Sequence, residues 1–208
     1  MSENNLVQRF TEAFDHGIWN DSESVSGPGS TLRYTSDLRA TLPGLIRALG
    51  CKSMLDAPCG DFNWMKEVDL SGIDYLGVDI VPALIANHRA KYQQHRFAVQ
   101  DITKDAFPKV DFVLCRDVLF HLSNSNIVRV LENFVQSGSE WLATSHYFKV
   151  TKMEDVESDP TTFRLVNLTG APFYVEQPDY VLKDCAPNFL RRWLGVWHRS
   201  WIAARFAS

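Results

Sequence analysis

The sequence lacks several patterns that mark common functional classes. Its 208 residues include only four cysteines, none in Cys-x-x-Cys spacing, so we expect reduced thiols rather than disulfides or a metal site. No apolar run approaches the length that spans a membrane, and residues 1–5 contain no lysine, arginine or signal-peptide core. These absences predict a cytoplasmic protein with no membrane partner.

Positive charge is also scarce. Lysine and arginine number 21 against 25 acidic residues, the net charge is -4, and only Arg191 and Arg192 stand together. Without a basic stripe the chain has no surface that tracks a phosphate backbone, which argues against a nucleic-acid substrate. With 45% hydrophobic residues, a chain of this length can bury one core. We therefore expect one domain.

What the sequence does contain is an apolar strand that runs directly into a tight turn. Ser53-Met-Leu-Asp56 is followed by Ala-Pro-Cys-Gly60, and a second apolar strand ends in Asp79 about twenty residues later. Sheets that bind nucleotides place a carboxylate at this point to hold ribose hydroxyls. The two strands predict an adenosine-type ligand, whereas the absence of Gly-x-Gly-x-x-Gly argues against an NAD-dependent dehydrogenase.

Strands and helices alternate through most of the chain. After a short helix at 5–17, the pattern predicts a helix at 36–49 capped by Thr35 or Ser36. Alternation with short loops indicates a parallel sheet with helices on both faces. The expected strands are 53–57, 75–79, 96–100, 111–115 and 140–146, and the expected further helices are 62–67, 82–92 and 123–136.

Taken in order, the glycine loop, Asp79, Gln100-Asp101-Ile102 and the segment from Asp111 to Asp117 resemble the class I S-adenosylmethionine-dependent methyltransferases over roughly residues 50–147. That family usually has Asp/Glu-x-Gly-x-Gly in the first loop; here only the last glycine remains, which alters the loop's shape. The resemblance implies an α/β, Rossmann-like, doubly wound and mostly parallel seven-stranded sheet. Its antiparallel C-terminal hairpin would come from 179–184 and about 193–203.

The resemblance also implies a division of the chain. We expect a single methyltransferase domain over 1–208, in which 1–50 supply N-terminal helices and a lid-like loop, 51–147 the cofactor-binding core, and 148–208 a substrate loop and the hairpin. The loop Ser26–Thr31 would close over the cofactor, or it would be a solvated linker.

By the same resemblance, four residues would hold the adenosine half of S-adenosylmethionine. Asp79 would accept both ribose hydroxyls, Ile80 would pack on the adenine, Asp101 would meet the adenine amino group, and the N–H of Ile102 would read a ring nitrogen. The alternative for each aspartate is an ordinary strand-end residue that caps a helix or a turn.

The methionine half of the cofactor would face Asp56, Cys59 and Gly60. Arg116 would bind the cofactor carboxylate or an anionic substrate, or it would pair with Asp117 and shape the loop after the fourth strand. Both readings of the arginine stay open from sequence alone.

His121 is the candidate catalytic base. A sulfonium methyl group is already electrophilic, so the enzyme must mainly align a nucleophile and remove its proton. An imidazole with a pKa of about 6.5 can take that proton near neutral pH. A structural role in ordering the loop is the equal alternative.

Three residues are the candidates for substrate binding: His146, at the end of the fifth strand, and Arg164 and Asn167, in an otherwise apolar segment. The acceptor would be a small polar molecule, with a sugar or cell-surface polysaccharide precursor favoured and oxygen or nitrogen open. A non-catalytic cofactor-binding or partner subunit is the alternative function. The C-terminal tryptophans would serve core packing or a homodimer surface.

Overall fold

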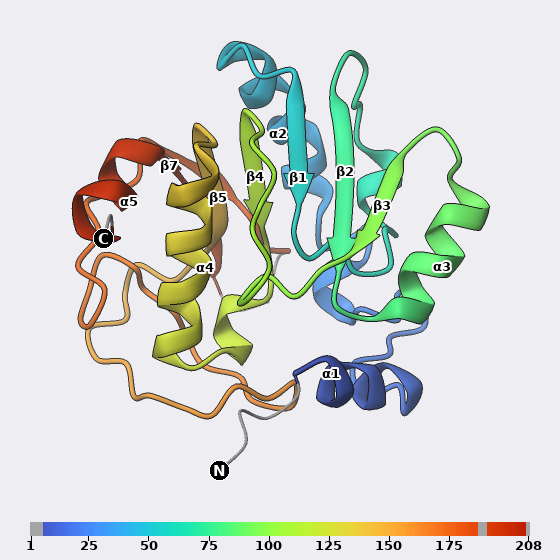
Figure 1. Ribbon diagram of the computed structural model, residues 1–208, viewed down its shortest axis with the longest axis horizontal. Coiled ribbons are helices and arrows are strands. Elements are labelled where there is room, and N and C mark those ends of the chain that lie inside the picture. Colours follow the sequence, from blue (N-terminus) through green and yellow to red (C-terminus); the bar gives the residue numbers. More distant parts are fainter. Residues whose placement is uncertain (1–5, 187–190, 207–208) are drawn as a thin grey trace.

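A seven-stranded sheet forms the centre of the molecule (Figure 1). The structure is a computed structural model that describes residues 6–186 and 191–206, and the strand count refers to those residues. The strand order is β3-β2-β1-β4-β5-β7-β6, with β7 antiparallel to β5 and β6 and the other pairs parallel. This arrangement confirms the predicted Rossmann-like α/β fold.

The elements follow the predicted alternation. The strands are β1 (Ser53–Asp56), β2 (Asp74–Asp79), β3 (Arg96–Val99), β4 (Phe112–Cys115), β5 (Trp141–His146), β6 (Tyr180–Lys183) and β7 (Trp193–His198). The helices are α1 (Leu6–Asp15), α2 (Ser36–Ala48), α3 (Pro82–Lys91), α4 (Asn124–Ser137) and α5 (Arg199–Phe206). Short 3-10 helices lie at Pro28–Ser30, Met65–Glu67 and Leu119–His121. Residue 5, where the first helix was expected to begin, lies outside the described residues.

Apolar clusters pack on the two faces of the sheet. Strand β4 is buried at every residue, as expected for a central parallel strand covered on both sides. One cluster takes residues from α4 and α5, including Ile127, Leu131, Phe134 and Ile202. The other takes residues from α2 and α3, including Leu38, Leu42, Ile46 and Ile85. The four cysteines are free and buried. Within the described ranges, no helix is long and apolar enough to cross a membrane.

Helix boundaries follow local chemistry, with three corrections to the predictions. The expected helix at 62–67 is reduced to one 3-10 turn, because Asp61 accepts the Asn63 N–H at 3.0 Å and Phe62 adopts a φ of 59°. Thr35 occupies the cap position of α2, but its hydroxyl donates to the Thr31 carbonyl instead of capping the helix. In contrast, Ser123 caps α4 by accepting the N–H of Asn126.

The third correction concerns the C-terminal hairpin. The second strand ends at His198, and α5 replaces the strand expected to continue to 203. The edge position belongs to β6, and β7 is inserted between β5 and β6. Trp197 is consequently a fully buried core residue whose indole N–H donates to the Glu176 carbonyl at 2.8 Å.

The strand order reverses between β1 and β4, which makes their carboxyl ends the switch point of the sheet. In an open α/β sheet, ligands bind in the crevice at that point. Figure 1 shows α1 lying across the molecule beyond the carboxyl ends of β1 and β2. The N-terminal helix therefore covers the place where the fold positions a ligand.

Candidate active site

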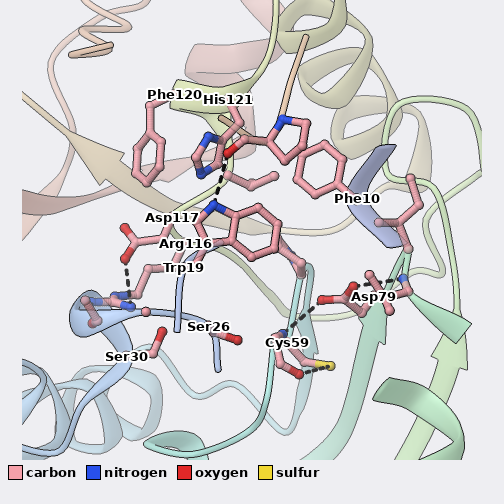
Figure 2. A pocket seen from close by; sticks show the side chains of 18 of the residues that line it. Phe10, Trp19, Ser26, Ser30, Cys59, Asp79, Arg116, Asp117, Phe120 and His121 are labelled. Carbon is pink, nitrogen blue, oxygen red and sulfur yellow. Dashed lines mark hydrogen bonds and ion pairs between the residues drawn. The ribbon is translucent and has the colours of Figure 1, made fainter. Parts of the chain in front are cut away.

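A cavity of about 700 Å³ lies at the switch point. Pockets for small ligands typically span about 300–1,000 Å³. Its lining comes from the loops that follow β1, β2, β3 and β4, from α1 and from residues 25–30 (Figure 2). The predicted lid segment Ser26–Ser30 is thus part of the cavity wall.

Asp79 ends β2 at the floor of the cavity. One carboxylate oxygen accepts the Gly60 N–H at 3.1 Å and the other accepts the Val81 N–H at 3.0 Å. A carboxylate has about four acceptor sites, and the Ile80 N–H also interacts with it, so capacity remains for a further donor. Burial raises the pKa of Asp79 to about 6. The residue fits a ribose diol by geometry and by hydrogen-bonding capacity.

Gly60 is the one glycine of the expected family loop that the chain keeps, and the structure requires it. Its φ is +51°, and a Cβ added there would lie 2.7 Å from the hydroxyl oxygen of Ser26. Its carbonyl accepts the Nε2 proton of His88, from α3, at 2.7 Å. The loop is therefore held from three directions: by Asp79, by His88, and by the Ser26 hydroxyl, which accepts the Asp61 N–H at 2.9 Å.

Asp56 ends β1 and is nearly inaccessible to solvent. The Tyr75 hydroxyl donates to one of its oxygens at 2.7 Å, while burial raises the pKa of Asp56 to about 7. Cys59 lines the same side of the cavity, and burial holds the pKa of its thiol well above the usual value. A cationic ligand group beside Asp56 would favour the ionised carboxylate and so gain a charged partner.

Asp101 follows β3 and has one unused oxygen. Its Oδ1 accepts both the N–H and the hydroxyl of Thr103, at 3.0 and 2.7 Å. Its Oδ2 is buried and makes no hydrogen bond with the described residues; the Lys104 ammonium forms a longer ion pair at 3.5 Å. An unsatisfied buried acceptor beside a cavity suits a ligand donor such as an exocyclic amine. Ile80 and Ile102 line the cavity nearby.

Arg116 takes part in a buried charge cluster. Its guanidinium binds both oxygens of Asp184, at 3.0 and 2.9 Å, contacts Asp117 at 3.1 Å and donates to the Gly29 carbonyl at 2.7 Å. Arg192 bridges the same two aspartates. These contacts favour the ion pair with Asp117, which was one of the roles that the sequence left open for Arg116. They also occupy the nitrogens of Arg116 that would otherwise bind a cofactor carboxylate.

His121 lines the opposite part of the cavity. Its Nδ1 donates to the Thr162 carbonyl, so the neutral ring carries its lone pair on Nε2. Burial lowers the pKa of His121 below its usual value, which keeps the ring neutral at neutral pH. Such an imidazole can accept a proton from a bound acceptor.

The three predicted substrate-binding residues do not line the cavity. His146 is fully buried and accepts the Leu168 N–H at 3.1 Å. Arg164 donates to the carbonyls of Leu122 and Glu154, and Asn167 donates to the Val150 carbonyl. All three side chains tie the 150–168 segment to its neighbours, so their expected role in binding substrate is not supported by the geometry.

The sequence analysis also missed residues that do line the cavity. Four aromatic or apolar side chains come from the N-terminal segment, and two tyrosines and an arginine complete the wall beside the charge cluster. They are Leu6, Phe10, Phe14, Trp19, Tyr34, Tyr147 and Arg192. The i, i+4 pair of Leu6 and Phe10 marks an apolar helix face, which was the one available signal.

Comparisons with known proteins concern the fold and the domain that contains the strand ends. Residues 54–141 match a sequence family described as a methyltransferase domain. No curated protein sequence matches the chain.

Solved structures similar to the chain include magnesium protoporphyrin IX methyltransferase from Synechocystis PCC 6803 with bound S-adenosylhomocysteine (13% identity, TM-score 0.59, 93% of this chain and 98% of that chain). They also include 1,6-didemethyltoxoflavin-N1-methyltransferase from Burkholderia thailandensis with 1,6-didemethyltoxoflavin and S-adenosylhomocysteine (16% identity, TM-score 0.61, 93% and 86%). The chain therefore has the Rossmann-like methyltransferase fold, and its residues 54–141 match a methyltransferase domain.

Proposed function

We propose that this protein is an S-adenosylmethionine-dependent methyltransferase that acts on a small molecule. The observation that carries the proposal is the set of strand-end carboxylates, Asp56, Asp79 and Asp101, which line one cavity. Asp79 and Asp101 keep hydrogen-bonding capacity that the protein leaves unused. The matched domain and the similar structures support the same cofactor.

Each residue has a defined task in this proposal. Asp79 accepts the two ribose hydroxyls, and Asp101 accepts the adenine amino group through Oδ2. Ile80 and Ile102 pack on the adenine ring. Asp56 faces the cationic methionine half. Arg116 acts indirectly, because its guanidinium holds the Gly29 carbonyl and so fixes the 26–30 segment against the cavity.

When bound, S-adenosylmethionine supplies an electrophilic methyl group whose bond to sulfur breaks, with its electron pair left on sulfur, as the bond to the acceptor forms. The protein's contribution is alignment and proton removal. We propose that His121 accepts the acceptor's proton at Nε2 and passes it to solvent, since Nδ1 is already committed to the Thr162 carbonyl. Proton transfer by a positioned base contributes typically about 10²–10⁴ in rate.

Calorimetric titration with S-adenosylmethionine and S-adenosylhomocysteine tests the cofactor. We expect both to bind, and Asp79→Asn to weaken binding by about 10–150-fold, from a charged hydrogen bond of about 1.5–3 kcal/mol. The matched control is Asp74→Asn on the same strand, which removes an exposed ion pair with Arg96 and leaves the cavity unchanged. If folded wild-type protein binds neither ligand, the cofactor assignment is wrong; if the wild type binds and both variants behave alike, the ribose is not held by Asp79.

A further inference from the structure

One side of the cavity is built from aromatic rings. We call Phe10, Trp19, Phe120, His121 and Phe163 the aromatic wall; all five line the cavity. Their ring centroids form a connected set, with Phe10 to Trp19 at 5.9 Å, Trp19 to His121 at 6.0 Å, His121 to Phe120 at 4.6 Å and Phe120 to Phe163 at 4.9 Å. These spacings are those of packed aromatic pairs.

The aromatic wall lies away from the carboxylates. Figure 2 shows Phe120 and His121 on the far side of Trp19 from Cys59 and Asp79. The 3-10 helix that carries Phe120 and His121 follows β4, whereas the ribose-binding position follows β2. The wall therefore borders the space that remains for the acceptor once the cofactor occupies the strand ends.

The polar atoms of this wall are already satisfied by the protein. The indole N–H of Trp19 donates to the Pro160 carbonyl at 3.0 Å, and Nδ1 of His121 donates to the Thr162 carbonyl. The Thr161 hydroxyl, also at the cavity, donates to Asp159. Among the described residues of the wall, Nε2 of His121 is the hydrogen-bonding atom left for a ligand.

We propose, given the methyltransferase function above, that the acceptor is a flat aromatic molecule with a hydroxyl group on its ring. Its ring would stack in the space bounded by Trp19 and Phe163, and its hydroxyl would donate to Nε2 of His121. A sugar would bring several hydroxyls to a wall that has one free partner, and each unpaired buried hydroxyl costs about 1–3 kcal/mol. This proposal replaces the expectation of a sugar acceptor.

The acid–base chemistry of His121 also favours an aromatic hydroxyl as the acceptor. A hydroxyl on an aromatic ring has a pKa of about 10, as in tyrosine. This pKa lies much closer to that of an imidazole than the pKa of an aliphatic alcohol does. As the oxygen–methyl bond forms, the oxygen–hydrogen bond breaks and the proton moves to Nε2 of His121. The products are the aryl methyl ether, the neutral thioether of the cofactor and a proton that leaves through the imidazole.

The test uses three probes: 2-naphthol, its saturated counterpart decahydro-2-naphthol, and methyl glucoside. Each is titrated into the full chain saturated with S-adenosylhomocysteine, and product formation with S-adenosylmethionine is followed by mass spectrometry. We expect 2-naphthol to bind and to be methylated on oxygen, at least about tenfold more tightly than the saturated alcohol. Methyl glucoside should do neither.

Two variants locate the binding. Phe163→Leu and Trp19→Leu should each weaken 2-naphthol binding by about tenfold or more while leaving the affinity for S-adenosylhomocysteine unchanged. Phe163 is 57% exposed, so its replacement does not threaten the fold. Trp201→Leu, an exposed tryptophan on α5 outside the cavity, is the control and should have no effect.

The outcomes separate the two proposals. Binding of S-adenosylhomocysteine without binding of 2-naphthol, equal binding of the two bicyclic alcohols, or methylation of the glucoside would each overturn the aromatic acceptor and leave the cofactor assignment intact. Failure to bind S-adenosylhomocysteine would overturn the methyltransferase proposal itself. Unchanged 2-naphthol binding in Phe163→Leu and Trp19→Leu would show that the aromatic wall is not the acceptor site.

Discussion

The unused oxygen of Asp101 offers the sharpest test of how the cofactor's base is recognised. Replacing Asp101 with asparagine retains one oxygen for the two Thr103 donors, which now lie 3.0 and 2.7 Å from Oδ1. The buried Oδ2, which makes no hydrogen bond in the described structure, becomes an NH₂ group. The substitution therefore changes an acceptor into a donor at the buried atom that the proposed contact with adenine would use.

The magnitude follows from that exchange. A hydrogen bond to a charged acceptor contributes about 1.5–3 kcal/mol, which corresponds to a loss of about 10–150-fold in affinity for S-adenosylhomocysteine. Folding should change little, because the lost ion pair with Lys104 is long and half exposed, and such pairs contribute at most about 1 kcal/mol.

Calorimetry with two ligands makes this test specific. The inosyl analogue of S-adenosylhomocysteine carries a carbonyl acceptor where adenine carries its amino donor. Wild-type protein should prefer the adenosyl ligand, and Asp101→Asn should reduce or reverse that preference, because its new NH₂ group can donate to the carbonyl. An unchanged preference, in a variant with wild-type thermal unfolding, would show that Asp101 does not read the base and would refute the reasoning.

Three further predictions follow from the site. His121→Ala should slow turnover by on the order of 10²–10⁴ in single-turnover assays while calorimetry shows unchanged cofactor affinity; slowing of less than about tenfold would make the residue structural. Burial raises the pKa of Asp56 to about 7 and of Asp79 to about 6, and a bound cation and ribose diol favour the ionised forms. Affinity for S-adenosylmethionine should therefore rise between about pH 5 and 8, with proton release measurable in buffers of different ionisation heat, and a flat profile would contradict this. Asp184→Asn, which leaves Arg116 and Arg192 without their shared buried carboxylate, should lower the unfolding free energy by about 3–5 kcal/mol in urea titrations, whereas Asp74→Asn should not.

The strand-end carboxylates could be located from sequence because the relevant information is local. Asp56 and Asp79 are the last residues of their strands and Asp101 comes two residues after β3, and parallel strands bring their carboxyl ends to one edge of the sheet. The position of these three carboxylates in the fold therefore follows from the order of the strands along the chain. The same local reasoning failed for 62–67, where an Asp61 side chain that binds the backbone competes with a helix.

Residues joined over long distances could not be located in this way. Arg116 and Asp184 are 68 positions apart, and neither flanking sequence indicates that they pair. His146 does stand at the carboxyl end of β5, as predicted, but the returning 166–168 segment covers it and uses its Nε2 as an acceptor. A strand end becomes a ligand site only where no other part of the chain fills the crevice, and that depends on tertiary packing.

The two sides of the cavity differ in how many hydrogen-bonding positions the folded protein leaves unoccupied. This difference explains why the fold indicates a cofactor but does not indicate an acceptor. At the strand ends, Asp79 and Asp101 retain free acceptor positions because the sheet geometry supplies fewer donors than their carboxylates can take. At the aromatic wall, the N-terminal segment and the 159–162 loop satisfy each other, as in the Trp19 and Pro160 pair. The sheet therefore predicts the cofactor, whereas the aromatic wall is formed by segments whose course the sheet does not specify.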